Sequence, residues 1–259
     1  MTNGYIAFIT GGSSGIGYEM ARQLLSDGAS VIVTARGGQR LEEARKSLSA
    51  FGDVHALTMD VRDEASVSEA AEWVRNRFGR VDMVISNAGI GNNAPGMDQL
   101  PENVMFWDIP TSVFKNVIDT NLTGHFLVAR RFVPLMIGQG HGSLVYVSTS
   151  TATMTRPGQI PYGPSKAGAE AMTAIMGEAL KDLGIMVNVI CPGGFTDTAM
   201  AGRGQKERFL KSGGTVLPPT VLNRTISFLA SPASAGIWGE KIVGKEFDEW
   251  LRKKGIAFG

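Results

Sequence analysis

Soft metal ligands and charged residues are scarce in this 259-residue sequence. It has one cysteine, Cys191, and three histidines, His55, His125 and His141. A single cysteine excludes a disulfide framework, and so few cysteine and histidine donors argue against a zinc cage, so we expect no metal. Charged residues make up 19% of the chain and the formal net charge is +1. This balance argues against a disordered tail protein and against nucleic acid as a partner.

Long apolar runs are also missing. No stretch approaches the ~18 residues that a membrane span needs, and the first four residues lack the basic start of a signal peptide. We therefore expect a cytoplasmic protein without a membrane partner. Glycine, in contrast, is abundant at 33 residues, which predicts many tight turns or close backbone approaches.

Short apolar runs alternate with helical patterns along the chain. Strands are expected at 5–9, 29–34, 54–59, 81–86, 143–147 and 185–190, and helices at 16–25, 41–48, 67–78, 113–136 and 167–183. Pro134 should end or kink the long helix. Runs of valine and isoleucine are typical of strands buried on both faces, so the pattern predicts an α/β fold with a doubly wound parallel sheet and helices on both faces. We expect a single domain over 1–259, with the irregular segments 91–110 and 196–219 as substrate loops.

A glycine cluster follows the first predicted strand and opens the first predicted helix. It reads Thr10-Gly11-Gly12-Ser13-Ser14-Gly15-Ile16-Gly17. Glycines let the backbone turn tightly and approach a pyrophosphate, and a helix N-terminus favours that anion. No Gly-Lys-Ser/Thr follows, so this is not a Walker loop. The alternative is a glycine-rich turn without a ligand. If a dinucleotide binds, its contacts are expected from Gly11, Ser13, Ser14, Gly15, Ile16 and Gly17.

The end of the second predicted strand indicates which dinucleotide would bind. It reads Thr34-Ala35-Arg36, and Arg40 lies one helical turn further on. NAD-binding proteins usually place a carboxylate here to accept the ribose 2′-hydroxyl, and none is present. A guanidinium pairs well with a 2′-phosphate. Arg36 and Arg40 therefore favour NADP(H) over NAD(H), unless both are merely solvated.

Tyr162 and Lys166 are spaced to share one face of a helix. A tyrosine has a free pKa of about 10, and a nearby ammonium favours its phenolate, so the pair suits proton transfer. An accidental pairing is the alternative.

Polar residues upstream add to this pattern. The predicted strand at 143–147 runs into Ser148-Thr149-Ser150, at the sheet edge where ligands bind in open α/β folds. Asn121 lies inside the long predicted helix, where asparagine is unfavourable without a specific contact. A solvent-facing side chain is the alternative for Asn121.

Taken together, these motifs resemble those of the short-chain dehydrogenase/reductase family, and in particular of its NADP-preferring members. The resemblance covers nearly the whole chain and follows this order: the glycine motif, Asp60-Val61, Asn87-Ala88-Gly89, Asn121, the strand ending in hydroxyls, Tyr162 with Lys166, and Pro192-Gly193. It implies a Rossmann-like fold of about seven parallel strands and a homodimer or homotetramer. The implied catalytic group is Asn121, Thr149, Tyr162 and Lys166. The implied further cofactor contacts are Asp60, Val61, Asn87, Ala88, Gly89, Tyr162, Lys166, Pro192, Gly193, Phe195, Thr196 and Thr198.

The chain also departs from the family pattern. The family's catalytic serine usually lies thirteen residues before the tyrosine, which is Thr149 here, with Ser148 and Ser150 as alternatives. The segment between Asn87 and Asn121 is several residues longer than is usual in the family, and the family's common Val-Asp-Gly-Gly ending is missing.

The function that follows is an NADP(H)-dependent oxidoreductase that interconverts a ketone or aldehyde and an alcohol by hydride transfer. Tyr162 would act as general acid/base and Thr149 would hydrogen-bond the carbonyl oxygen. Lys166 would lower the tyrosine pKa and contact the nicotinamide ribose, and Asn121 would anchor a water. The alternatives are a 3-oxoacyl-thioester reductase of the same class and a non-catalytic NADP-sensing module.

Overall fold

A computed structural model describes residues 4–91, 94–97, 100, 104–200 and 204–259. Its centre is a parallel sheet of seven strands in the order β3-β2-β1-β4-β5-β6-β7. The strands are β1 (Ile6–Thr10), β2 (Ser30–Ala35), β3 (Val54–Thr58), β4 (Met83–Ser86), β5 (Gly142–Val147), β6 (Ile185–Cys191) and β7 (Lys241–Val243). This confirms the predicted Rossmann-like, doubly wound sheet. The short strand β7 lies outside the six runs that hydrophobicity marked.

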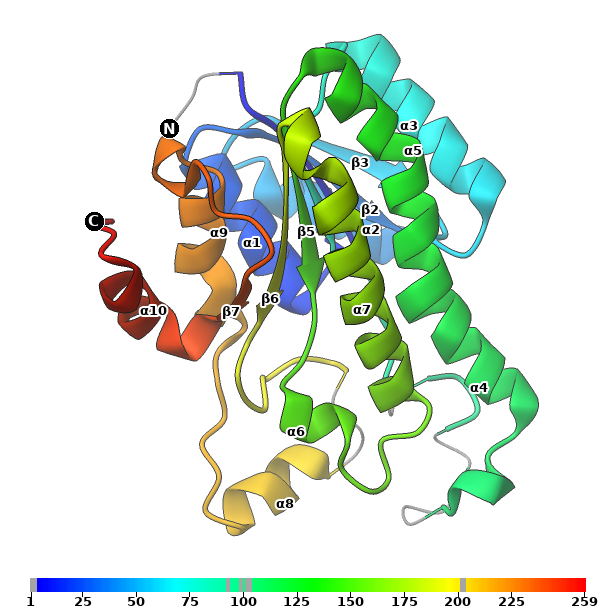
Figure 1. Ribbon diagram of the computed structural model, residues 1–259. Coiled ribbons are helices and arrows are strands. Elements are labelled where there is room, and N and C mark those ends of the chain that lie inside the picture. Colours follow the sequence, from blue (N-terminus) through cyan, green and yellow to red (C-terminus); the bar gives the residue numbers. More distant parts are fainter. Residues whose placement is uncertain (1–3, 92–93, 98–99, 101–103, 201–203) are drawn as a thin grey trace.

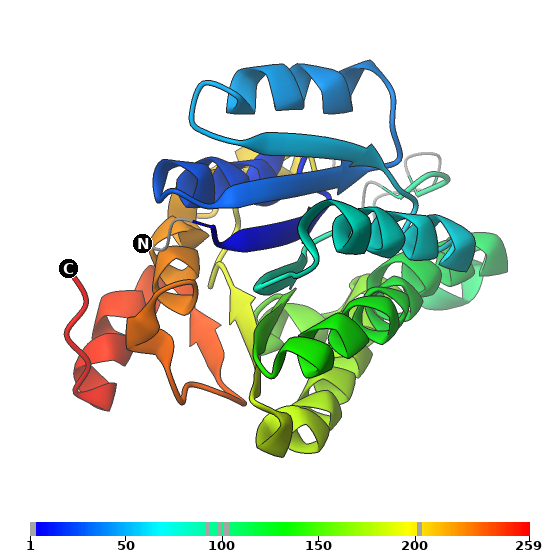
Figure 2. The ribbon, with the colours of Figure 1, turned by 90° about the horizontal axis from the view of Figure 1, so that it is seen from above.

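Helices cover both faces of the sheet (Figures 1 and 2). The longer helices are α1 (Gly15–Ser26), α2 (Gln39–Leu48), α3 (Glu64–Phe78), α4 (Thr111–Ile118), α5 (Gly124–Gln139), α7 (Tyr162–Leu180) and α10 (Phe247–Lys254), and the shorter ones are α6 (Thr151–Met154), α8 (Gln205–Lys211) and α9 (Asn223–Leu229). One core joins α1, α2, α9 and α10 to the sheet, and a second joins α3, α5 and the end of α7 to its other face. The central strands β1, β4 and β5 are buried on both faces, as their apolar runs predict, whereas the edge strands β3 and β7 are only partly buried.

The helix predicted over 113–136 is three pieces. A π-helical turn, Asp119–Thr123, separates α4 from α5. The expectation that Pro134 ends the helix is wrong, because α5 continues to Gln139. Pro134 lies on the exposed side, while Phe132 and Met136 are buried on either side of it. Packing of the apolar face therefore outweighs the hydrogen bond that proline cannot donate.

The helix predicted from residue 167 begins earlier, at Tyr162. Pro164 lies in its first turn, where proline is tolerated because the N–H groups there have no partner within the helix. Tyr162 and Lys166 therefore share one helix, as their spacing predicts. This helix starts at the carboxyl edge of the sheet, the lower side of Figure 1, where α6 and α8 also lie.

Candidate functional site

The loops that follow β1, β4, β5 and β6 meet at the carboxyl edge of the sheet. They contain the glycine motif, the segment 87–89, the three hydroxyls at 148–150 and the segment 192–198. An ideal Cβ built on Gly15 would come within 3.3 Å of Thr198, and one on Gly11 within 2.9 Å of the Ala88 Cα. Segments far apart in sequence thus form one site, as the strand order of an open α/β sheet dictates.

The glycine loop is held from the side by Asn87. The Asn87 Nδ2 donates hydrogen bonds to the carbonyl oxygens of Thr10 (2.9 Å) and Gly11 (3.1 Å). Gly11 has a φ of +67°, and a Cβ on Gly17 would lie 2.4 Å from the Gly11 oxygen, so neither position accepts a larger residue. The helix α1 starts directly after Ser14, whose side chain makes no capping hydrogen bond. The first N–H groups of α1 are therefore available to an anion such as a pyrophosphate.

Two arginines follow β2 at the same edge. Arg36 and Arg40 are exposed, and neither makes a hydrogen bond or ion pair with another residue in the described part of the chain. Arg36 is close enough to Asp60 to contribute to the low pKa of that carboxyl, although the main cause is Arg62. The guanidinium groups of Arg36 and Arg40 are thus free to pair with a phosphate.

Asp60 and Val61, which the family resemblance implies as cofactor contacts, both have partners within the protein. Arg62 donates to the Asp60 carboxylate from Nε (3.0 Å) and Nη2 (2.6 Å), which fixes the carboxylate in an ion pair. Val61 is mostly buried and packs so closely on α5 that a Cβ on Gly124 would lie 2.8 Å from it. Both residues remain at the edge of the site, beside β3.

The three hydroxyls after β5 have different partners. Thr149 lies near enough to the phenol of Tyr162 to favour its ionised form and so to lower its pKa. The Ser148 hydroxyl is buried and has no hydrogen-bond partner among the described residues, and Ser150 caps α6 by accepting the Thr153 N–H at 3.2 Å. Of the three hydroxyls, Thr149 is therefore the one that acts on the tyrosine, and it is also the one that the thirteen-residue spacing marks.

Burial controls the proton affinities of Tyr162 and Lys166. The surrounding protein raises the pKa of Tyr162 to about 12, although the Thr149 hydroxyl opposes this rise. Burial lowers the pKa of Lys166 to about 8, partly offset by the nearby Glu170 carboxylate. Lys166 is not among the causes that act on the Tyr162 pKa here, so its expected lowering of that pKa stays a prediction for the site with the cofactor bound. The Lys166 Nζ donates to the Val147 carbonyl at 2.9 Å and lies 5.9 Å from the centre of the Tyr162 ring, so desolvation of the phenol is the larger effect.

Asn121 projects inward from the π-helical turn and is 1% exposed, so it is not a solvent-facing side chain. Its Oδ1 accepts the Ile90 N–H, and its Nδ2 donates to the Ile90 carbonyl and to the Ser165 hydroxyl, each at 2.9 Å. Both amide hydrogens are thus used. Asn121 connects the segment after β4 to α7, and its NH₂ group has no donor left for a water.

The segment after β6 crosses the site toward α1. Gly193 has a φ of +87°, and a Cβ there would lie 2.4 Å from Val243. Phe195 stacks on Phe209 with ring centres 5.0 Å apart. The other cofactor candidates of this segment are Pro192, whose carbonyl accepts the Lys245 N–H; Thr196, which bridges to Leu217; and Thr198, beside Gly15.

The two predicted substrate loops lie next to this cluster. Met200 and the ring of Tyr162 both lie beside Gly91, because a Cβ there would come within 3.4 Å of the first and 3.5 Å of the second. The parts at 92–93, 98–99, 101–103 and 201–203 lie outside the described residues. Each loop therefore has a residue close to the tyrosine, Gly91 in one and Met200 in the other.

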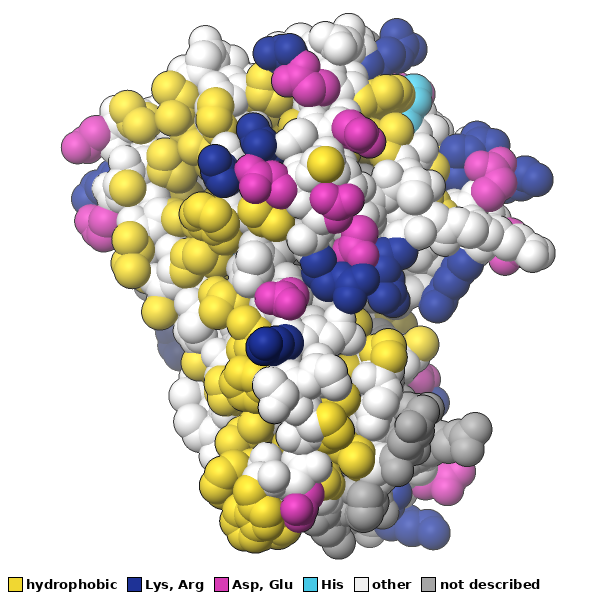
Figure 3. All heavy atoms as spheres, turned by 90° about the vertical axis from the view of Figure 1, so that its right-hand side faces the viewer, with side chains coloured by type: hydrophobic (Ala, Val, Ile, Leu, Met, Phe, Trp, Pro, Cys, Tyr) yellow, Lys and Arg dark blue, Asp and Glu magenta, His cyan; other side chains and the backbone are white. Residues whose placement is uncertain are grey.

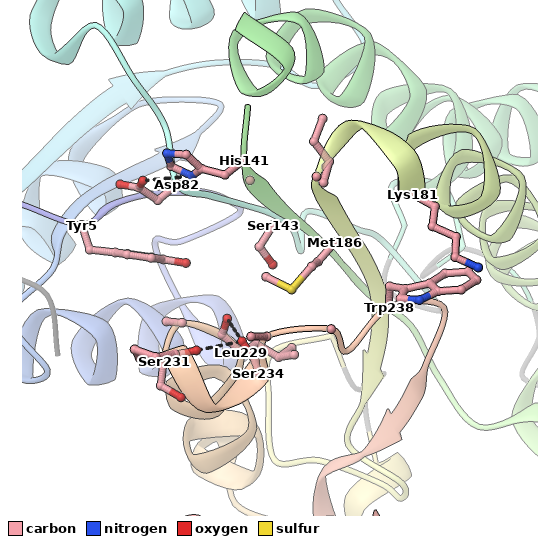
Figure 4. Close-up of a pocket in the computed structure, with 17 residues that line it drawn as sticks. Tyr5, Asp82, His141, Ser143, Lys181, Met186, Leu229, Ser231, Ser234 and Trp238 are labelled. Atoms are coloured by element: carbon pink, nitrogen blue, oxygen red, sulfur yellow. Dashed lines mark hydrogen bonds and ion pairs between the residues drawn. The ribbon is translucent and has the colours of Figure 1, made fainter. Parts of the chain in front are cut away.

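A second hollow lies at the opposite edge of the sheet (Figure 4). It has a volume of about 490 Å³, and its lining includes Tyr5, Asp82, Ser143, Met186 and Trp238, which precede or open strands. This hollow is separate from the tyrosine cluster, which lies beyond the other ends of the strands.

Two kinds of feature are absent from the described residues. No group of three or more histidine, cysteine or acidic residues among them could hold a metal ion. Within the same ranges, no helix is both long and apolar enough to cross a bilayer.

Comparison with known proteins identifies the family. Residues 5–208 match the short chain dehydrogenase family. A 3-oxoacyl-(acyl-carrier-protein) reductase FabG from Thermotoga maritima is 32% identical over 246 residues, which cover 92% of this chain and 95% of that protein.

Solved structures agree with this assignment. A candidate short-chain alcohol dehydrogenase from Sinorhizobium meliloti superposes with a TM-score of 0.84 at 27% identity, covering 96% of this chain and 98% of that one. A 3-ketoacyl-(acyl-carrier-protein) reductase from Brucella melitensis, complexed with NADH, gives a TM-score of 0.81 at 26% identity and covers 93% and 96% of the two chains. Because the family match spans well over half of the chain, the protein belongs to the short-chain dehydrogenase family.

Proposed function

We propose that this oxidoreductase uses NADP(H) to interconvert a ketone or aldehyde and the corresponding alcohol, with Tyr162 as the proton donor and acceptor. The observation that carries the proposal is that Tyr162 and the buried Lys166 share the first turns of α7, with the Thr149 hydroxyl near enough to the phenol to favour its ionised form. A carbonyl oxygen placed between these two hydroxyls would receive a hydrogen bond from one and a proton from the other.

The residues at the carboxyl edge fit a dinucleotide. When bound, the nicotinamide supplies the hydride. In the glycine loop, a Cβ at Gly11 or Gly17 would collide with backbone, so these positions need glycine for the loop to take this shape. The first N–H groups of α1, which follow the loop, would receive the pyrophosphate. Segment 87–89 would line the middle of the cofactor, and segment 192–198 its nicotinamide end.

Arg36 and Arg40 support the phosphorylated form of the cofactor. Both guanidinium groups are exposed and without ion-pair partners in the described ranges, and no carboxylate follows β2. The similar reductase from Brucella melitensis is complexed with NADH, so the preference is a property to be tested on this chain.

The proton affinities of the site favour the reductive direction near neutral pH. A phenol with a pKa raised to about 12 keeps its proton, which makes Tyr162 an acid ready to protonate an alkoxide as it forms. Lys166, with its pKa lowered to about 8, still carries its charge at pH 7. A positive charge beside the tyrosine would stabilise the phenolate that remains after proton transfer.

Two alternatives remain. A 3-oxoacyl-thioester reductase is supported by the 32% identity to the reductase from Thermotoga maritima. A non-catalytic NADP sensor has no use for a tyrosine and a buried lysine placed together at the start of α7, so we regard it as the weaker alternative.

The test is consumption of NADPH, followed by its absorbance, with separate panels of ketones, aldehydes and 3-oxoacyl thioesters. We expect turnover with at least one panel, and its loss in Tyr162→Phe. Turnover by thioesters alone would select the first alternative. NADPH binding without turnover on any panel would contradict the proposal and favour the sensor.

We also propose that the chain forms a homodimer or homotetramer. Large apolar side chains are exposed on α4 (Phe114), α5 (Phe126 and Ile137) and α7 (Ile175), and Figure 3 shows hydrophobic side chains gathered on this side of the molecule. Light scattering with size-exclusion chromatography should give a mass above that of one chain, and Ile175→Glu should reduce it. A monomer at high concentration would contradict this.

A further inference from the structure

Two residues without a role in the proposed reaction lie directly behind Lys166. The ring of Tyr146, on β5, has its centre 4.8 Å from the Lys166 Nζ. The imidazole of His125, on α5, stacks on the same ring with centres 4.4 Å apart and planes 28° apart. All three side chains are buried, with exposed fractions of 1–3%. An ammonium, a phenol ring and an imidazole therefore form one enclosed stack.

Tyr146 also contacts a second residue of the catalytic group. Its hydroxyl donates a long hydrogen bond, 3.4 Å, to the backbone carbonyl of Asn121 in the π-helical turn. Tyr146 thus contacts Lys166 through its ring and Asn121 through its hydroxyl. The two contacts use different parts of the side chain, so substitution can separate them.

Hydrogen bonding and burial keep His125 neutral. The Thr173 hydroxyl donates to the Ala169 carbonyl at 2.7 Å, so its oxygen is left to accept the Nε2–H of His125 at 2.9 Å. The Nδ1 of His125 is then unprotonated, and it has no partner in the described structure. Burial, with a smaller contribution from Lys166, lowers the pKa of His125 to about 3. A neutral imidazole supports the Tyr146 ring without repelling the ammonium.

We propose that Tyr146, supported by His125, is a positioning residue that holds the Lys166 side chain in its charged form at the active site. The inference rests on the proposed function only where it says what the Lys166 charge is for, namely to stabilise the Tyr162 phenolate. The arrangement itself stands on the ring contacts and the burial of the three side chains.

The ring and the burial act on Lys166 in opposite directions. Burial favours the neutral amine, whereas the negative face of an aromatic ring favours the ammonium. The other ionisable groups that face Lys166 are Tyr162 and Glu170, both on α7; Glu170 raises the lysine pKa and is itself paired with Lys241 at 2.7 Å. Cys191 on β6 acts on Tyr162. Removal of the Tyr146 ring leaves these groups in place and should release the amine proton at lower pH.

The direct test is an NMR titration of protein labelled at the lysine Cε positions, with the Lys166 signal assigned by its absence in Lys166→Met. We expect Tyr146→Leu to lower the pH midpoint of Lys166 by about one unit, and Tyr146→Phe, which keeps the ring, to leave it unchanged. Phe132→Leu is the matched control. Phe132 is a buried aromatic residue whose ring lies tilted against that of Phe8, with ring centres 4.3 Å apart, and its loss should reduce stability without moving the midpoint.

An unchanged midpoint in Tyr146→Leu, or an equal shift in Phe132→Leu, would overturn the inference. If Tyr146→Leu does not fold, Tyr146→Met fills more of the same space and is held to the same outcomes. The pH profile of carbonyl reduction should follow the titration, with its alkaline limb displaced by the same amount. The titration needs no turnover, so absent activity in the unmodified protein would count against the proposed function and not against this contact.

Discussion

Asn121 donates a hydrogen bond of 2.9 Å to the hydroxyl of Ser165, and so connects the π-helical turn before α5 to the helix that carries Tyr162 and Lys166. The Ser165 hydroxyl in turn donates to the Tyr162 carbonyl at 2.7 Å. With the two bonds to Ile90, Asn121 fixes three parts of the site at once. Its role in this structure is that of a brace inside the site.

Asn121→Ala should therefore affect both stability and activity. The substitution leaves the partly buried N–H and carbonyl of Ile90 without their Asn121 partners, which should cost about 1–3 kcal/mol of unfolding free energy. Denaturant unfolding measures the loss, and kcat should fall because α7 is no longer held. Asn116→Ala, which removes one partly exposed bond to Arg62, is the control and should cost about 0.5 kcal/mol or less. Equal losses in the two variants would contradict the bracing role.

Arg36 should determine the cofactor preference. NADPH is expected to bind more tightly than NADH by at least about tenfold, or about 1.4 kcal/mol, because the exposed guanidinium pairs with the 2′-phosphate. Arg36→Asp should abolish or reverse this preference in fluorescence titrations with both cofactors. Arg75→Asp makes the same charge change on α3 and should leave the preference intact. Equal affinities in the unmodified protein would show that the arginine has no such role.

Thr149 should be the hydroxyl that matters for turnover. Thr149→Ala removes the hydroxyl that favours the ionised form of Tyr162 and a donor for the carbonyl oxygen, so kcat should fall by about 10²-fold while the Kd for NADPH stays near normal. Ser148→Ala and Ser150→Ala are the matched controls and should retain most activity. A severe loss in Ser150→Ala alone would mean that the assignment from spacing and contact is wrong.

Tyr162→Phe keeps the ring and removes only the hydroxyl. Turnover should fall by roughly the 10²–10⁴-fold typical of general acid–base catalysis, with NADPH binding intact. Because burial raises the pKa of Tyr162 to about 12, oxidation of the alcohol should accelerate as pH rises toward that value, whereas reduction should not. Near-normal turnover by Tyr162→Phe would rule out this residue as the proton carrier.

Lys166 should make stability depend on pH in the alkaline range. Its pKa falls from 10.5 to about 8 on folding, so between these values the unfolded chain binds more protons and stability rises with pH. The full effect is on the order of 3 kcal/mol. It should appear in denaturant unfolding between pH 8 and pH 10 and be absent from Lys166→Met. A parallel pH dependence in both proteins would show that Lys166 is not titrating in this window.

Much of the fold is visible in the sequence because it depends on local patterns. Six of the seven strands coincide with the mostly apolar runs of the sequence, and burial of central strands on both faces of a parallel sheet favours such runs. The glycine motif and the spacing of Tyr162 and Lys166 are equally local, since a turn conformation and a helix face depend on neighbours in the chain. Strand β7 is three residues long and too short for a periodic signal.

The tertiary structure decided the properties that depend on what surrounds a side chain. The spacing in the sequence marked Thr149 as the catalytic hydroxyl. Only the structure shows that Ser148 is buried and that Ser150 caps α6, which makes both less suited to that role. Burial raises the pKa of Tyr162, and this effect could not be foreseen because the desolvation comes from segments distant in the chain. The stack of His125 and Tyr146 behind Lys166 is likewise a tertiary feature, since it brings together side chains from α5, β5 and α7. Residue types and their spacing are written in the sequence, whereas proton affinity and contact depend on the packed environment that the whole chain creates.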